Sequence, residues 1–459
     1  MRVGFGPIIP KPITDRATVR QCMVNLQSVR RQLTQEELAF FSDEGVLNIV
    51  MDIVMSEPGV FDDLFPVIGM FHHAKVVMRC GGRLLTGSGM DSACIESGVF
   101  GAKILQQVLA ATHYVRCLQG LLIISEMLDK LLFEAFWEAN QEAELLCIKD
   151  IVCDLREALA DKCSDRSSQK LDELLNTTDI LRQKLDEYVK ECSEKSALCQ
   201  YFMVFQEIVM TLKKIIISDR DGNWPLHVHS IGSSLKIFAE FDAYRYHRIT
   251  SWYYERIKVL EKTRPQLFRR FNMGYFVVRD REGSKFSAVS GDLKLEQSVN
   301  RFTTGPGAPA TVGKPGDEAA LTEFALLFHE ILAITNLLQS LTSPKLLDHN
   351  ETNIRHDITG SSGLVFDQNV KKLLDFVKAR VNPFRMPEAR VPLYNIVSNQ
   401  TVSAAIESRL VNCLKNGETI YLQIRKEMFV DKSRKISDTL HRRMLPTFVT
   451  ETPKEKVKV

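Results

Sequence analysis

Several features are missing from this sequence of 459 residues, and each absence excludes a class of protein. Its ten cysteines include no Cys-x-x-Cys pair and no Cys/His group with zinc-ligand spacing, which excludes a zinc finger and favours reduced thiols. The first residues, MRVGFGPIIPKPITDR, lack the apolar core of a signal peptide. No stretch reaches the roughly 18 uninterrupted apolar residues of a membrane span. We therefore expect an intracellular protein, nuclear or cytoplasmic, that is neither secreted nor bound in a membrane.

The chain also lacks a strong excess of charge of either sign. Its formal net charge is +2, so binding to nucleic acid would have to use a local basic patch. The apolar fraction of 45% and the charged fraction of 25% are those of an ordinary globular protein. The length predicts two or three substructures.

The N-terminal part is predicted to be a small α/β element. Residues 14–35 have the pattern of an amphipathic helix. The apolar run ELAFFSDEG predicts a buried strand that ends at Asp43, and VLNIVMDIVMSE predicts a helix that closes at Pro58. The run LFPVIGMFHH predicts a second strand that ends in His72 and His73. Strand, helix and strand together form a βαβ unit.

The middle of the chain is predicted to be a helical bundle. A glycine-rich loop over 81–101 comes first. The segment 104–132 then carries apolar residues at spacings of three and four, as a core-facing helix does. Polar turns are expected at 219–225 and at the other short connections. Further helices are predicted over about 141–160, 168–192, 196–218 and from 226 through 264.

Strand character returns after the bundle. GYFVVRDREGSKFSAVSGD predicts a hairpin around an Arg-Glu-Gly turn, and LKLEQSVNRF begins a helix that carries Glu296 and Asn300 on one face. TTGPGAPATVGKPGDE is a flexible loop, followed by a helix over 319–341. The expected domains are 1–79 (N-terminal part of an α/β core), 80–265 (helical insertion), 266–345 (completion of the core), 346–446 (C-terminal mixed region) and 447–459 (disordered tail).

Three motifs fail on inspection. GAPATVGKP has the wrong glycine spacing for a phosphate-binding loop, and Pro315 follows its lysine. His329 and Glu330 lack the second histidine of a helical zinc protease. His227 and His229 could share one face of an extended segment, but no third ligand stands nearby in the sequence.

The strongest constellation lies at the predicted strand ends. Asp43 and His72 follow the two strands, and Glu296 opens a later helix close to Asp292. Ligands of open α/β sheets bind in the crevice beyond the strand ends, where separated carboxylates can hold Mg²⁺ against phosphate oxygens. The pattern predicts a catalytic site of Asp43, Glu296 and His72, with Asp43, Asp292 and Glu296 as metal ligands. The structural alternative is that an aspartate after a strand forms a turn or a helix cap.

Two segments could contact nucleic acid. The aromatic run YRYHRITSWYY mixes rings and arginines as single-strand grooves do, although such rings at helical spacing are more often core residues. A basic stretch near the C-terminus could neutralise DNA phosphates, or could be a solvated helix face. Its cationic residues are Arg425, Lys426, Lys432, Arg434, Lys435, Arg442 and Arg443.

The sequence resembles an uncharacterised, multi-copy protein family of animal genomes, related to a domain of unknown function that is associated with mobile elements. The matching segments run in order through nearly the whole chain. They include FSDEGVLN, FPVIGMFHHAK, LLTGSGMDSACIESGVFG, FDAYRYHRITSWYYERI, FALLFHEILAITNLL and YLQIRKEMFVDKSRKIS.

That family's strand-Asp, strand-His and Glu-Gln-x-x-Asn pattern is similar to transposases of the RNase H-like class. The resemblance implies Asp43 and Glu296 as metal carboxylates, His72 and Asn300 as their neighbours, and a helical insertion that interrupts a small sheet. An upstream acidic residue of longer relatives has no counterpart here, and the loop after Glu296 is rich in proline. We therefore expect a mainly α protein with an incomplete RNase H-like mixed sheet.

Two functions remain open at this point. The first is a mobile-element-derived protein, ancestrally a Mg²⁺-dependent nuclease or transposase acting on DNA, whose activity is lost. The second is a non-enzymatic helical module that binds protein or nucleic acid.

Overall fold

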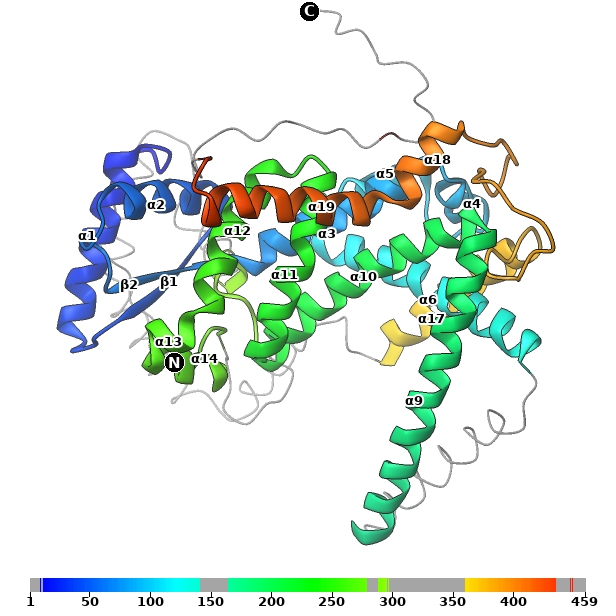
Figure 1. The fold of residues 1–459 in the computed structure, drawn as a ribbon, viewed down its shortest axis with the longest axis horizontal. Coiled ribbons are helices and arrows are strands. Elements are labelled where there is room, and N and C mark those ends of the chain that lie inside the picture. The colour runs from blue at the N-terminus through cyan, green and yellow to red at the C-terminus, as the bar shows by residue number, and fades with distance from the viewer. Residues whose placement is uncertain are drawn as a thin grey trace, which may run out of the picture. The chain divides into compact units, whose positions relative to one another are not determined.

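A computed structural model of the protein describes residues 11–140, 164–278, 288–294 and 360–434, together with residues 9, 296, 446 and 448. Within these residues the fold is mainly α with one two-stranded parallel sheet (Figure 1), as the sequence predicts. The chain divides into two compact units, each built from three separate segments. The first unit comprises Met1–Cys80, Met210–Leu364 and Lys415–Met444, and the second comprises Gly81–Val209, Val365–Leu414 and Leu445–Val459. The helices between residues 210 and 265 thus group with the N-terminal segment, whereas the sequence analysis assigns them to the insertion.

The first unit contains the βαβ element, which is confirmed. Its elements are α1 (Arg16–Gln32), β1 (Leu38–Ser42), α2 (Glu44–Ser56) and β2 (Leu64–Ile68). The strands are parallel, in a register that places Leu38 beside Leu64 and Ser42 beside Ile68. Helix α1 packs on both strands and α2 packs on β2. Every residue of β2 is buried, but β1, predicted as a buried strand, is only half-buried.

Four helices pack behind this element in the first unit: α11 (Trp224–Glu240), α12 (Tyr244–Lys258), α13 (Leu260–Thr263) and α14 (Pro265–Asn272). Helix α12 contacts α11, α2 and β2. The rings of Phe65 from β2, Trp224, Phe271 and Phe276 are almost fully buried together, with ring centroids of Trp224 and Phe271 4.7 Å apart. This aromatic core joins the sheet to the helices.

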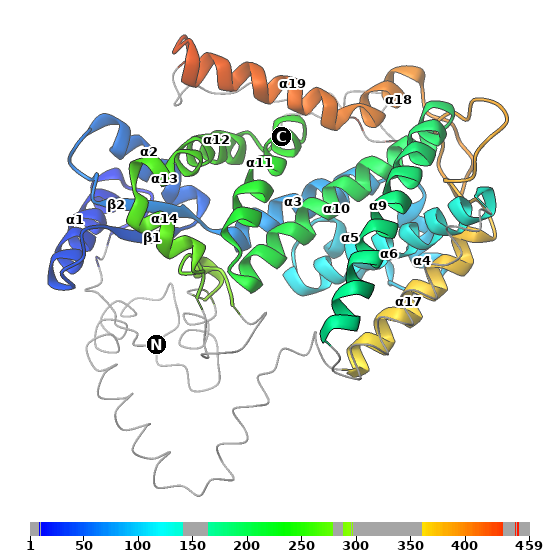
Figure 2. The same ribbon diagram turned by 60° about the horizontal axis from the view of Figure 1, so that its bottom comes forward.

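The C-terminal helix α19 (Cys413–Arg425) continues into a π-helical turn, η4 (Lys426–Val430). From Lys415 onward these residues belong to the first unit. Figure 2 shows α19 lying across α11 and α12. The contact with α11 is unusually close at Gly417, where an added Cβ would overlap the main-chain carbonyl of Lys236. The glycine therefore allows two helix backbones to touch.

The second unit is mainly helical in its described part, with a non-helical stretch over 379–403. It contains α4 (Met90–Glu96), α5 (Ala102–Leu109), α6 (Tyr114–Ala139), α9 (Ser164–Lys195), α18 (Ala404–Val411) and most of α17 (Gly360–Lys378). Helices α3 (Met70–Leu85) and α10 (Ala197–Asp221) contribute residues to both units. The apolar stripe predicted over 104–132 is buried along α6 at Ile124, Leu128 and Leu131. The predicted helix over 141–160 lies outside the described residues.

Two predicted connections are wrong. The expected loop over 81–101 is largely helix, because α3 continues to Leu85 and α4 follows at Met90. Gly82 lies inside α3, where a Cβ would overlap the main chain of Leu109, so this glycine marks a close helix contact and not a flexible loop. The turn expected over 219–225 shrinks because α10 extends to Asp221 and α11 begins at Trp224.

Among the helices in the described part of the chain, none is by itself both long enough and apolar enough to cross a membrane. Helices α5 and α6 reach the required length and apolar character only as a pair, with a bend of 95° between them.

Candidate functional site

The first candidate residue, Asp43, follows directly after β1, as predicted. It is the N-cap of α2, and its Oδ1 accepts a hydrogen bond from the main-chain N–H of Val46 at 2.9 Å. Such a bond satisfies one of the otherwise unpaired donors of a helix's first turn. The carboxylate at this strand end therefore has a structural role.

The second strand does not reach the histidines, which corrects the sequence prediction. Strand β2 ends at Ile68, and α3 begins at Met70, so His72 and His73 both lie in the first turn of a helix. The apolar run continues past the strand because Met70 and Phe71 are also buried. Successive helix positions face different directions. His73 is accordingly fully buried, whereas the His72 side chain is 35% exposed.

Asp292 caps the start of α3. Its carboxylate accepts hydrogen bonds from the main-chain N–H groups of Phe71 at 3.3 Å and His72 at 3.1 Å. Oδ2 also lies 3.2 Å from Nδ1 of the His72 ring. The Asp292 side chain is only 6% exposed. A buried carboxylate at a helix N-terminus is favoured by the helix dipole as well as by these bonds.

The segment 288–294 reaches the strand ends because glycines leave room for it. A Cβ at Gly69 would lie 2.5 Å from Oδ2 of Asp292, and a Cβ at Gly291 would lie 2.5 Å from the Phe41 ring. An antiparallel bridge between Val278 and Val289 holds the segment, with N···O distances of 2.8 and 2.9 Å. This bridge lies where the sequence predicts a hairpin, whose turn at 279–287 is outside the described residues.

Asp292 and His72 shift each other's protonation. The hydrogen bond that the His72 ring donates to Asp292 raises the pKa of His72 against the opposing effect of partial burial. Burial raises the pKa of Asp292, but the hydrogen bonds from His72, Ser290 and Phe71 outweigh it and the pKa is lowered. The raised pKa of His72 stabilises the fold below pH 6.5 and this contribution disappears above the folded-state pKa. The lowered pKa of Asp292 stabilises it above pH 3.8, so the ion pair is strongest between these limits.

The substitution Asp292→Asn should lower the pKa of His72, because the negative charge beside Nδ1 is removed. The measurement is an NMR titration of the imidazole Cε1–H resonances, with His72→Gln used to assign the signal. Asp43→Asn is the matched control, since Asp43 caps a different helix and should leave the His72 titration in place. An unchanged His72 pKa in Asp292→Asn would show that the pair does not form in solution.

Glu296 lies close to this pair. Its charge contributes to the raised pKa of His72, and its Oε2 is buried without a hydrogen-bond partner among the described residues. The same carboxylates also act on the Tyr246 phenol. Burial is the main cause that raises its pKa, and the negative charges of Glu44, Asp43 and Asp292 raise it further. The positive charge of Arg79 lowers it. Asn300, the predicted neighbour of Glu296, is outside the described residues.

The predicted Mg²⁺ site is not assembled by the part of the chain that the structure describes. No three His, Cys, Asp or Glu side chains in it are placed to hold a metal ion. Oδ1 of Asp43 and both oxygens of Asp292 already accept main-chain N–H bonds, and Oε2 of Glu296 is buried without a hydrogen-bond partner among the described residues. Magnesium binding therefore stays a prediction.

A buried polar cluster beneath the site was missed in the sequence. It contains His73, whose Nε2 lies 2.9 Å from Oγ of Ser234, and His227, whose Nε2 lies 3.1 Å from the Tyr253 hydroxyl. Burial lowers the pKa of both histidines to about 3. Asp219 is also buried, and its pKa is raised well above 3.8 by burial and by Asp292. At neutral pH the two imidazoles are thus uncharged.

His227 and His229 do not share a face of an extended segment, which corrects their interpretation. Both lie in α11, where His227 is buried and stacks on the Trp224 ring at 5.0 Å. His229 lies with Nε2 3.0 Å from Nζ of Lys214. Their only shared feature is a place in one helix.

The predicted DNA-contacting residues carry less unpaired charge than the sequence indicates. Nε of Arg425 lies 2.6 Å from Oε1 of Glu255, and Nε of Arg434 lies 2.6 Å from Oε2 of Glu427. Nζ of Lys426 lies 3.9 Å from Oδ2 of Asp431. Lys432 is exposed at a left-handed backbone position, and Lys435, Arg442 and Arg443 are outside the described residues.

The aromatic run of α12 mostly serves the core. Trp252 and Tyr253 are buried, and the guanidinium of Arg256 lies over the Trp252 ring at 4.8 Å. Arg248 donates to Oδ1 of Asn48 in α2 at 2.8 Å. These side chains fasten α12 to its neighbours instead of forming a stacking groove.

Comparison with known sequences assigns the chain to a family. It belongs to the family of the domain of unknown function DUF8702, whose sequence model matches residues 1–447. No curated protein and no solved structure matches the chain.

Proposed function

We propose that this protein derives from a mobile-element enzyme that processed DNA with Mg²⁺, a nuclease or transposase of the RNase H-like class, and that its cleavage activity is lost. The carrying observation is that Asp43, which follows β1, and Asp292, which lies at the start of α3 just beyond β2, each cap a helix. The strand ends are where such an enzyme would hold its metal. The caps account for carboxylates at these positions without metal-dependent chemistry.

The hydrogen bonding at Asp292 supports loss of activity. Mg²⁺ requires nearly octahedral oxygen ligands and loses its waters reluctantly, so a carboxylate must present free lone pairs to it. Asp292 already accepts two main-chain N–H groups and faces the His72 ring. A cation would therefore compete with the cap of α3 for this carboxylate, which is only 6% exposed. Losing the cap would leave unpaired N–H donors at the helix start.

The test is a cleavage assay on single- and double-stranded DNA with Mg²⁺ or Mn²⁺. We expect no metal-dependent cleavage by the natural sequence. The proposed loss of activity would be wrong if the natural sequence and the exposed control Asp62→Ala cleave DNA while Asp43→Ala and Glu296→Ala do not. That result would establish the protein as an active enzyme. Cleavage that all three variants retain would remove the strand-end site from consideration.

The second candidate is a non-enzymatic helical module that binds a protein partner. The ion pairs of Arg425 with Glu255 and of Arg434 with Glu427 favour it over DNA binding, because each pair removes a cation that could neutralise a phosphate. DNA affinity that falls steeply with salt concentration would instead favour nucleic acid as the partner.

A further inference from the structure

The sheet of the first unit has one open edge, along β1. The main-chain N–H of Leu38 donates to the carbonyl of Asp63 at 3.0 Å, where the parallel pairing of β1 with β2 begins. The main-chain groups of successive strand residues point to opposite sides, so Leu38 and Phe40 face β2, whereas Ala39 and Phe41 face away from it. No hydrogen bond joins the outward N–H and C=O groups of these two residues to another described residue.

The opposite edge of the sheet, along β2, is closed. The same alternation makes Pro66 an outward-facing residue of β2, and proline has no N–H to offer to a further strand. The outward N–H of Leu64 already donates to the carbonyl of Phe61 at 3.0 Å. Every residue of β2 is also buried, whereas every residue of β1 is partly exposed. Another strand can therefore join the sheet only at β1.

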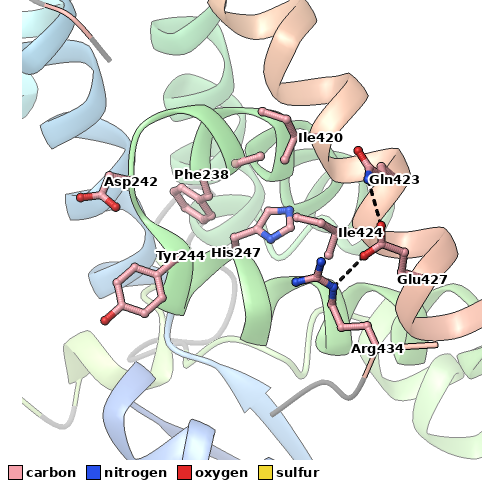
Figure 3. A pocket seen from close by; sticks show the side chains of 10 residues that line it. Phe238, Asp242, Tyr244, His247, Ile420, Gln423, Ile424, Glu427 and Arg434 are labelled. Carbon is pink, nitrogen blue, oxygen red and sulfur yellow. Dashed lines mark hydrogen bonds and ion pairs between the residues drawn. The ribbon is translucent and has the colours of Figure 1, made fainter. Parts of the chain in front are cut away.

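The sequence of β1 does not protect its open edge. Proteins usually guard such an edge with proline, lysine or another charged residue, but β1 reads LAFFS. By contrast, the ion pair at the pocket of about 160 Å³ between α11, α12 and α19 is complete within the chain, since Glu427 accepts hydrogen bonds from Gln423 at 2.9 Å and from Arg434 at 2.6 Å (Figure 3). The edge of β1 presents two donors and two acceptors beside apolar side chains, which is the chemistry that an extended strand recognises.

We propose that β1 pairs with β1 of a second copy of this chain, antiparallel about a twofold axis at Phe40. The two outward residues stand one position before and one position after Phe40, so Ala39 of each copy exchanges N–H···O bonds with Phe41 of the other. One strand edge thereby satisfies all of its own outward groups, as a twofold interface requires. Phe40 meets Phe40 across the axis, and the small Ala39 lies opposite the large Phe41.

The closed edge of β2 limits this assembly to two copies. The joined sheet has the order β2-β1-β1-β2, and Pro66 blocks both of its outer edges, so pairing cannot continue into a filament. At each end of the paired strands Glu37 stands opposite Asp43, but Glu37 is already paired with Arg264, whose Nη1 lies 3.0 Å from its Oε1. Contact along one short strand is small beside the roughly 1,200 to 2,000 Å² of stable interfaces, so we expect a dissociation constant in the micromolar range. The pairing uses the main chain of β1 and is independent of the proposed function.

The test is the mass of the full chain in solution, measured by analytical ultracentrifugation over a range of micromolar concentrations. We expect a monomer–dimer equilibrium, in which hydrogen–deuterium exchange at the amides of Ala39 and Phe41 slows as the dimer forms. Ala39→Pro removes an outward N–H without touching the bonds between β1 and β2, so it should raise the dissociation constant at least tenfold. Ala39→Lys, which places a charge at the edge, should do the same.

Ala102→Pro is the matched control. It makes the same substitution at the first residue of α5, an exposed position where a helix needs no N–H, and should leave the dissociation constant unchanged. Circular dichroism would establish that each variant is folded, and Ala39→Lys preserves the test if Ala39→Pro is not. The proposal is overturned if the natural sequence stays monomeric, if both Ala39 variants dimerise as it does, or if the amides of Ala39 and Phe41 exchange equally fast in monomer and dimer.

Discussion

Gly417→Ala should lower the free energy of unfolding of the first unit by about 3 kcal/mol. In most helices this change is stabilising by about 0.5 to 1 kcal/mol, because alanine restricts the unfolded chain more than glycine does. Here the added methyl group would overlap the carbonyl of Lys236 in α11, and a main-chain atom cannot move aside as a side-chain rotamer can. Helices α19 and α11 must therefore move apart, and the packing between them is lost.

Gly363→Ala is the matched control for this expectation. Gly363 lies in α17 with no atom within 4 Å of an added Cβ, so this variant should be slightly more stable than the natural sequence. Urea unfolding followed by tryptophan fluorescence suits the measurement, because Trp224 and Trp252 lie in the first unit and Trp137→Phe removes the signal of the second. Equal stability of Gly417→Ala and Gly363→Ala would contradict the close packing of α19 on α11.

Acidification from pH 6.5 to pH 5 should destabilise the first unit through its buried histidines. Burial lowers the pKa of His73 and His227 to about 3 and that of His247 to about 4. Below pH 6.5 the unfolded chain binds protons that the folded chain does not, so stability is complete above pH 6.5 and falls as the pH falls. Between pH 6.5 and pH 5 each histidine lowers the free energy of unfolding by about 1.6 kcal/mol, and the three together by about 5 kcal/mol. The raised pKa of Asp219 acts in the opposite direction and reduces the observed loss.

A variant comparison isolates one of these contributions. The free energy of unfolding of His247→Phe should fall between pH 6.5 and pH 5 by about 1.6 kcal/mol less than that of the natural sequence. His229→Gln serves as the control. His229 is less buried than His247, so its removal should change the pH dependence of the free energy of unfolding little. Parallel pH profiles of His247→Phe and the natural sequence would mean that His247 is not buried as a neutral ring.

Local periodicity in the sequence was sufficient to predict the βαβ element and the long helices. Strand β2 and helices α1, α2 and α6 carry apolar patterns that depend only on their own residues. The glycine-rich region 81–101 was predicted wrongly because Gly82 has two opposite meanings in a sequence: a flexible position, or a position where another backbone comes close. The two meanings are distinguished only by the contact with Leu109, which is close to Gly82 in space but not in the sequence.

The candidate site was predictable in its residues but not in its contacts. Asp43 was placed correctly after β1, because an apolar run that stops at an aspartate is a local signal. The pairing of Asp292 with His72 joins residues 220 positions apart, and no local pattern encodes it. The burial of His73 and His227 was not predicted, because a histidine inside an apolar helix has the same sequence pattern whether it is a core residue or a ligand.

The construction of the first unit from three separate segments has a consequence for its synthesis. The N–H groups at the start of α3 emerge early, but their acceptor, Asp292, is made more than 200 residues later, after all of 81–209. Helix α19, which covers α11 and α12, follows later still. A ribosome-bound chain therefore holds the strand ends uncovered until Asp292 has been synthesised and the face of α11 uncovered until α19 has been synthesised, a period in which exposed apolar surface favours chaperone binding and aggregation.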